Sequence, residues 1–137
     1  MNFNLYLIFN GNCAEAMTVN VEIFGGEITE IHTFGNSTLA SGMPTAMHKL
    51  IMHVSLRIGD RVIMASDDPS GKYEPPRGAH VQTRFPKFAE AQRIFDPLAE
   101  GGEITMPFEK TFWTSGFGML RDRFGIPWMV NCDDRVD

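Results

Sequence analysis

The feature that most constrains this chain is an internal repeat. An Ala-Glu-Ala string at residues 14–16 precedes a Gly-Gly-Glu-Ile-Thr string at residues 25–29, and both recur in the same order at residues 89–91 and 101–105. The nearly constant offset, 75 residues for the first string and 76 for the second, indicates duplication of one supersecondary unit. We therefore expect two similar halves.

Each repeat contains an amphipathic helix. Apolar residues recur at three- to four-residue spacing within residues 14–24 and 88–98, which predicts a helix with one buried stripe in each half. Asn12 is placed to cap the first helix, with Glu15 reaching back in a capping box. The Gly-Gly pairs are expected to end both helices, because glycine readily adopts the left-handed conformation found there.

Strand-like segments surround each helix, so that each half has the order βαβββ. Gly59 and Asp60 suit a two-residue hairpin turn with glycine at its first central position. Besides the strand that follows each helix, the predicted strands are residues 3–9, 51–58 and 61–66 in the first half, and 80–85, 117–121 and 126–131 in the second. The fold class predicted from these elements is α+β, with two βαβββ modules.

The domain organisation follows from the repeat and from one stretch rich in turn-forming residues. Residues 69–78 contain proline, glycine and serine and are predicted to be a linker. We expect a single domain over residues 1–137, with a first module at 1–68 and a second at 79–134. A length of 137 residues with 43% hydrophobic residues is sufficient for one core.

Charge and composition exclude several classes of partner. The net charge is −5 and there is no basic cluster, which disfavours nucleic acid and anionic membranes. No stretch approaches the about 20 apolar residues of a membrane span, and no signal sequence is evident at the N-terminus. The two cysteines do not suggest a secreted disulfide scaffold. We expect a cytoplasmic protein with reduced thiols.

Several segments resemble PhnB-like proteins, a branch of the vicinal oxygen chelate superfamily of glyoxalases, bleomycin resistance proteins and extradiol dioxygenases. The matching strings are YLIFNGNCAEA at 6–16, FGGEI at 24–28, IMHVSLRIG at 51–59, MASD at 64–67, and FW, FGM, FG and PW within 112–128. The resemblance implies a glyoxalase/bleomycin-resistance-like fold of curved mixed sheets, and a homodimer. Some such proteins are labelled 3-demethylubiquinone 3-methyltransferase. That activity is disfavoured, because the chain lacks the glycine-rich strand-to-helix loop of common methyl-donor domains.

The resemblance also points to a metal site that this sequence does not retain. Metal enzymes of the superfamily carry ligands at positions that correspond here to Leu5, Met64, His80 and Met129. Leucine has no donor atom, and methionine is a weak donor for zinc, iron or magnesium, so His80 alone can serve. We expect no cofactor. A divalent metal is possible, for example at a rebuilt site around His80.

A shared sheet face is the main candidate for a ligand pocket. The two-residue turn predicts that Ser55 lies opposite Met64, with His53 on the same face. The resemblance makes this face concave and turns His80 and Met129 toward it. His53 and His80 are candidates for acid/base chemistry near neutral pH, or for hydrogen bonding within a half-buried sheet.

The remaining candidates are aromatic residues and one thiol. Trp113, Phe117 and Trp128 are suited to stacking on a flat ligand, or to filling the core. Cys13, at the start of a helix, is either a thiol with a lowered pKa or a small packing residue.

Two hypotheses from different classes remain. The first is metal-independent binding of a small molecule by Leu5, Ser55, Met64, Trp113, Phe117, Trp128 and Met129. The second is a lyase, isomerase or dioxygenase that uses a rebuilt metal site or His53 and His80.

Overall fold

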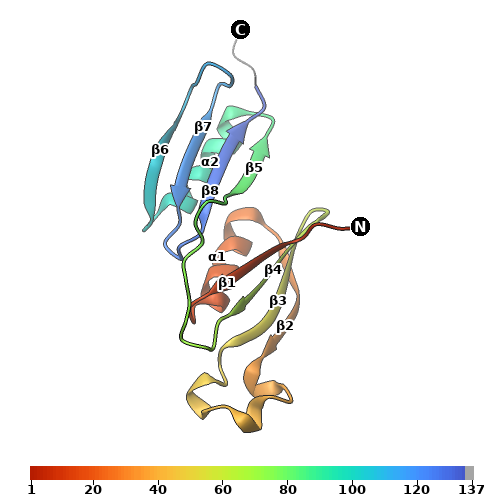
Figure 1. The fold of residues 1–137 in the computed structure, drawn as a ribbon. Helices are drawn as coiled ribbons and strands as arrows, with labels where there is room; N and C mark the ends of the chain where they lie inside the picture. Colours follow the sequence, from red (N-terminus) through yellow and green to blue (C-terminus); the bar gives the residue numbers. More distant parts are fainter. Residues whose placement is uncertain (135–137) are drawn as a thin grey trace. The chain divides into compact units, whose positions relative to one another are not determined.

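The computed structural model describes residues 1–134 and divides the chain into two compact units, Met1–Tyr73 and Glu74–Asp137. The boundary between them falls within the predicted linker at 69–78. Each unit contains one long helix against one four-stranded mixed sheet (Figure 1). No helix within residues 1–134 has the length and hydrophobicity to span a membrane.

The two units have the same order of elements. The first contains β1 (Leu5–Phe9), α1 (Cys13–Phe24), β2 (Glu27–Thr33), β3 (Ile51–Ile58) and β4 (Arg61–Asp67), with three short 3-10 turns at Phe34–Asn36, Ala40–Gly42 and Thr45–Met47. The second contains β5 (Val81–Phe85), α2 (Phe88–Ala99), β6 (Glu103–Glu109), β7 (Phe117–Arg121) and β8 (Pro127–Cys132). The predicted α+β fold of two βαβββ modules is confirmed.

The sheets also share their topology. The strand orders are β1-β4-β3-β2 and β5-β8-β7-β6. The parallel pairs are β1 with β4 and β5 with β8. Phe9 pairs with Asp67 in the first sheet, and Phe85 with Cys132 in the second. These pairs give a residue-by-residue correspondence between the units.

The repeated Gly-Gly pairs have two separate roles. Gly25 ends α1 at φ 77°, a left-handed conformation that favours glycine. A Cβ on Gly26 would lie 2.3 Å from the Arg57 carbonyl oxygen, and one on Gly102 would lie 2.3 Å from the Arg121 carbonyl oxygen. The second glycine therefore lets the strand after the helix approach its neighbour. In the second unit the helix ends at Ala99, before its glycines.

The predicted capping box is not the cap of α1. Asn12 makes no side-chain cap hydrogen bond. Instead Asp67, at the end of β4, accepts hydrogen bonds through Oδ1 from the backbone N–H groups of Gly11 and Cys13, at 2.9 and 3.0 Å. Its Oδ2 accepts from Ile51 N–H at 2.9 Å. The positive end of the helix dipole favours a carboxylate at this position. A residue 54 positions after the start of the helix therefore takes the place of the local cap.

Candidate functional site

In each sheet one face packs against the helix and the other does not. In the second unit, a Cβ on Gly118 would lie 2.7 Å from the Phe95 ring of α2, so Gly118 faces the helix. Because side chains alternate along a strand, its neighbours Phe117 and Met119 face the other way. We call this second side the helix-free face.

The helix-free face of the first unit contains a continuous row across all four strands. Tyr6 pairs with Met64, Met64 with Ser55, and Ser55 with Glu30. The opposition of Ser55 and Met64 predicted from the sequence is confirmed. His53 lies two residues before Ser55 on β3, and it pairs with His32 on β2.

Three of these residues form a hydrogen-bonded chain. Tyr6 Oη lies 3.1 Å from His53 Nδ1, and His53 Nε2 lies 3.1 Å from Ser55 Oγ. The Tyr6 and His53 rings are 5.7 Å apart between centroids. Tyr6 is 42% exposed and Ser55 only 8%, so the chain runs from an accessible phenol to a buried hydroxyl.

The hydrogen bonds from Tyr6 through His53 to Ser55 can run in either direction. A neutral imidazole has one N–H donor and one acceptor nitrogen. If Ser55 donates to Nε2, then Nδ1–H donates to the phenol oxygen, and the Tyr6 hydroxyl proton is available to a ligand. In the opposite tautomer Tyr6 donates to Nδ1, and its oxygen can accept a hydrogen bond from a ligand. The site can therefore present a donor or an acceptor at one position.

The helix-free face of the second unit has a different chemistry. Gln82 pairs with Met129, Met129 with Met119, and Met119 with Met106. Phe117 lies on the same face and contacts Trp113 edge to face, with ring centroids 5.4 Å apart. Phe117 and Met129, which were both named as candidate ligand-binding residues, lie on this face, and Trp113 is 47% exposed.

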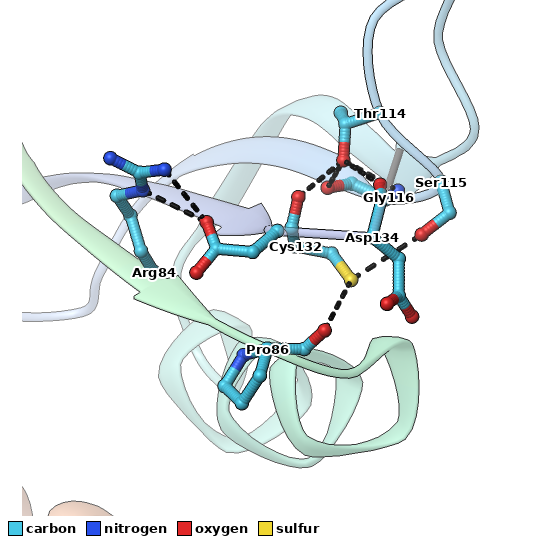
Figure 2. Close-up of polar contacts among 8 residues, drawn as sticks. Arg84, Pro86, Thr114, Ser115, Gly116, Cys132 and Asp134 are labelled. Atoms are coloured by element: carbon cyan, nitrogen blue, oxygen red, sulfur yellow. Dashed lines mark hydrogen bonds and ion pairs between the residues drawn. The ribbon is translucent and has the colours of Figure 1, made fainter. Parts of the chain in front are cut away.

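A buried threonine holds the loop that carries Trp113. Figure 2 shows the Thr114 hydroxyl at the centre of several contacts, with the carbonyl oxygens of Gly116, Cys132 and Asp134 around it. Its side chain joins the loop before β7 to the end of β8, because those carbonyls lie on both segments. Thr114 is only 2% exposed.

Trp128 is not a wall of an accessible pocket. It is 1% exposed, and its Nε1–H donates to Asp122 Oδ2 at 2.9 Å. It pairs with Val81 and Leu120, so it lies on the opposite side of β8 from Met129. Of the two roles considered for Trp128, the structure supports packing in the core.

Leu5 is also misplaced by the sequence-based mapping. It pairs with Ile63, whereas Met64 pairs with Tyr6, so Leu5 points to the helix side of the sheet. His80 is exposed and precedes β5, in the second unit, whereas His53 belongs to the first unit. Their joint action in acid/base chemistry remains a prediction.

The residues present do not fit the divalent metal that the fold family implies. Leu5 has no donor and faces away, and Met64 and Met129 offer thioethers, which are poor ligands for hard or borderline divalent ions. Within residues 1–134 there is no group of three His, Cys, Asp or Glu side chains placed to hold an ion.

Two buried groups, Cys13 and Asp122, have pKa values above their ordinary ones. Burial, with the nearby charge of Asp67, raises the pKa of the Cys13 thiol to about 12, so Cys13 is a packing residue and not an activated nucleophile. Burial also raises the pKa of Asp122 above its ordinary value, against hydrogen bonds from Ile126, Trp128 and Phe124 that lower it.

Three features were missed from the sequence. Tyr6 lies at the position assigned to Leu5; residues 5–9 alternate in burial, but their sequence, LYLIF, is apolar or aromatic throughout and gave no signal for it. Met106 and Met119 complete a row with Met129, which required the register of the second hairpin. Asp67 as a distant helix cap carried no local signal.

Comparisons with known proteins agree with this fold. The model of the Glyoxalase/Bleomycin resistance protein/Dioxygenase superfamily matches residues 2–130. Protein YjdN of Escherichia coli (strain K12) is 36% identical over 140 residues, which cover 96% of this chain and 95% of YjdN.

Solved structures extend the likeness. The crystal structure of protein PA1353 from Pseudomonas aeruginosa has a TM-score of 0.89 and 41% identity, covering 98% of both chains. The PhnB protein from Bacillus cereus shares the fold, with a TM-score of 0.78 and 20% identity over 96% of this chain and 99% of that one. The chain belongs to the Glyoxalase/Bleomycin resistance protein/Dioxygenase superfamily.

Proposed function

We propose that this protein binds a small oxygen-bearing organic molecule on the helix-free face of its first unit, without a divalent metal. The observation that carries the proposal is the chain from Tyr6 through His53 to Ser55, at 3.1 Å for each contact. A small-molecule site needs a few polar groups in fixed positions on a less polar surface. Met64, between Tyr6 and Ser55, supplies the apolar part.

The exposed end of this chain determines what it would recognise. Tyr6 presents one hydroxyl that donates or accepts according to the tautomer of His53, which suits carbonyl and hydroxyl groups equally. Ile8, on the same face and 43% exposed, adds apolar surface beside it. A ligand with one ring and one or two oxygens fits these features.

The test is ligand-observed NMR of metal-free protein with phenol, catechol and benzoate as probes. Tyr6→Phe removes only the hydroxyl and should weaken binding about fivefold or more, since one hydrogen bond contributes roughly 1 kcal/mol. Tyr73→Phe, which removes the chain's other tyrosine hydroxyl in the segment after β4, is the matched control. Binding that survives Tyr6→Phe and His53→Ala unchanged would rule out this site.

A proton-transfer enzyme is the second candidate, and the hydrogen bonding of both His53 nitrogens favours it. In that reaction Tyr6 oxygen takes a proton from the substrate while its own proton passes to His53 Nδ1. The measurement is deuterium incorporation next to the carbonyl of pyruvate in D2O. Incorporation that depends on His53 would favour the enzyme, and its absence with retained binding would favour the binding protein.

We further propose a cytoplasmic homodimer. In each sheet, taken by itself, an edge strand carries exposed apolar side chains, including Ile28 and Ile31 on β2 and Ile104 on β6. Exposed edges with apolar residues are typical of surfaces that another chain covers. Light scattering on size-fractionated protein tests the proposal, and a monomer at micromolar concentration would contradict it.

A further inference from the structure

We infer that the second unit binds a soft monovalent cation, Cu(I) or Ag(I), through a row of three methionines: Met106, Met119 and Met129. We call this row the methionine row. It is separate from the ligand site proposed above, because its residues belong to the other unit.

The register of the sheet brings the three thioethers together. Met119 on β7 pairs with Met106 on β6 and with Met129 on β8, so two methionines flank a central one on adjacent strands. Directly paired residues have Cβ atoms about 4.5–5.5 Å apart. Methionine has three rotatable side-chain bonds, which allow all three sulfur atoms to converge above Met119.

The methionine row is accessible and lies on the side away from the helix. Met106 is 40% exposed, and Met119 and Met129 are half-buried. Gly118, next to Met119, faces α2, so Met119 lies on the opposite side of the sheet. Met129 and Met106 are its pairing partners, and the register of β6 against β7 shifts on both sides of Met106. An ion would reach the sulfur atoms from the helix-free face.

The donor set selects the ion. Three neutral thioethers are soft ligands, which favour Cu(I) and its analogue Ag(I) and are poor partners for zinc, magnesium or calcium. The Phe117 ring, two residues from Met119 and in contact with Trp113, adds aromatic surface that attracts a cation.

The charged side chains near the methionine row are largely engaged elsewhere. Glu109 pairs with Phe117 across the strands and adds a negative charge. Arg84 is held by Asp133 at 2.9 Å, and the Arg121 guanidinium donates to the carbonyl oxygens of Gly125 and Pro76.

The first unit supplies an internal control. Its equivalent row is Tyr6, Met64, Ser55 and Glu30, so that Met64 corresponds to Met129 but is paired across the strands with Tyr6 and Ser55. The same sheet geometry therefore presents one thioether in one unit and three in the other. Met64→Leu is the matched variant for Met119→Leu, and both conserve volume.

The experiment is titration of the whole chain, carrying 13C-labelled methionine methyl groups, with Ag(I), followed by anaerobic Cu(I) with a competing chelator. We expect one ion per chain, with the methyl signals of Met106, Met119 and Met129 shifting among the nine methionines. Met119→Leu should weaken binding about tenfold or more, and Met64→Leu less than about twofold. Zn(II) should leave the three signals in place.

Other results would overturn the inference. Shifts spread over other methionines, including the exposed Met1 and the half-buried Met64, would mean unspecific contact with single thioethers. A reaction confined to Cys13 or Cys132, with no methyl shift, would place the ion at a thiol. Equal affinity of Met119→Leu and the unsubstituted protein for the ion would show that Met119 is not a ligand, and the proposed site would then be wrong.

Discussion

The same row of the same sheet carries different chemistry in the two units. Tyr6, Met64, Ser55 and Glu30 in the first correspond to Gln82, Met129, Met119 and Met106 in the second, as the strand pairings require. The first row hydrogen-bonds through His53, whereas the second presents thioethers next to two aromatic rings. Duplication has preserved the register while the side chains on the helix-free face diverged.

Trp128 should show the largest effect on stability, because it corresponds to Ile63 but is a larger, fully buried side chain. Trp128→Ala is expected to lower the free energy of unfolding by about 3–5 kcal/mol. Trp113→Ala, on the partly exposed loop, should cost under about 1 kcal/mol. Urea unfolding followed by circular dichroism compares the two, and equal losses would contradict the assignment of Trp128 to the core.

The corresponding residues Asp67 and Cys132 test the helix supports of the two units. Asp67→Ala leaves three backbone N–H groups without their acceptor and should cost about 3–4 kcal/mol. Cys132→Ala should cost about 1–2 kcal/mol, since the thiol mainly packs. A lower urea midpoint for Cys132→Ala than for Asp67→Ala would contradict the role of Asp67 as the cap of α1.

The hairpin turns differ as well. Asp122 is buried between β7 and β8 and accepts from Phe124, Ile126 and Trp128, whereas Asp60 in the first hairpin is exposed. Asp122→Asn is expected to cost about 1–3 kcal/mol and Asp60→Asn less than about 0.5 kcal/mol.

The loss in Asp122→Asn should depend on pH. Burial raises the pKa of Asp122 in the folded state, so folding favours its protonated form. The stability from this group is present below the ordinary carboxyl pKa and is lost as pH rises through the raised pKa. The difference between the unsubstituted protein and Asp122→Asn should therefore shrink as pH rises. Urea unfolding between pH 3 and 7 measures it, and a difference that grows with pH would contradict the assignment.

Tyr6→Phe should have only a small effect on stability. The phenol is 42% exposed, so losing its hydrogen bond to His53 should cost about 0.5–1 kcal/mol. The His53 ring nitrogens should nevertheless change their 15N chemical shifts, because Nδ1 loses its partner. Unchanged shifts would mean that the hydrogen bond is absent in solution.

Local patterns predicted the fold well and the site only in part. The repeat, the hairpin turn at Gly59 and the pairing of Ser55 with Met64 follow from spacing and alternation, which act over a few residues. Leu5 was assigned to the wrong face because a shift of one residue reverses the side of a strand. The cap from Asp67 and the burial of Trp128 depend on contacts between distant segments, which no local pattern reports.

The most direct test of the account is a binding map of metal-free protein, made by titrating catechol into the EDTA-treated chain and following amide and methyl signals by NMR. The account predicts shifts centred on Tyr6, His53, Ser55 and Met64, unchanged by added zinc or nickel. Binding that appears only after a divalent metal is added, or shifts confined to the second unit, would contradict it.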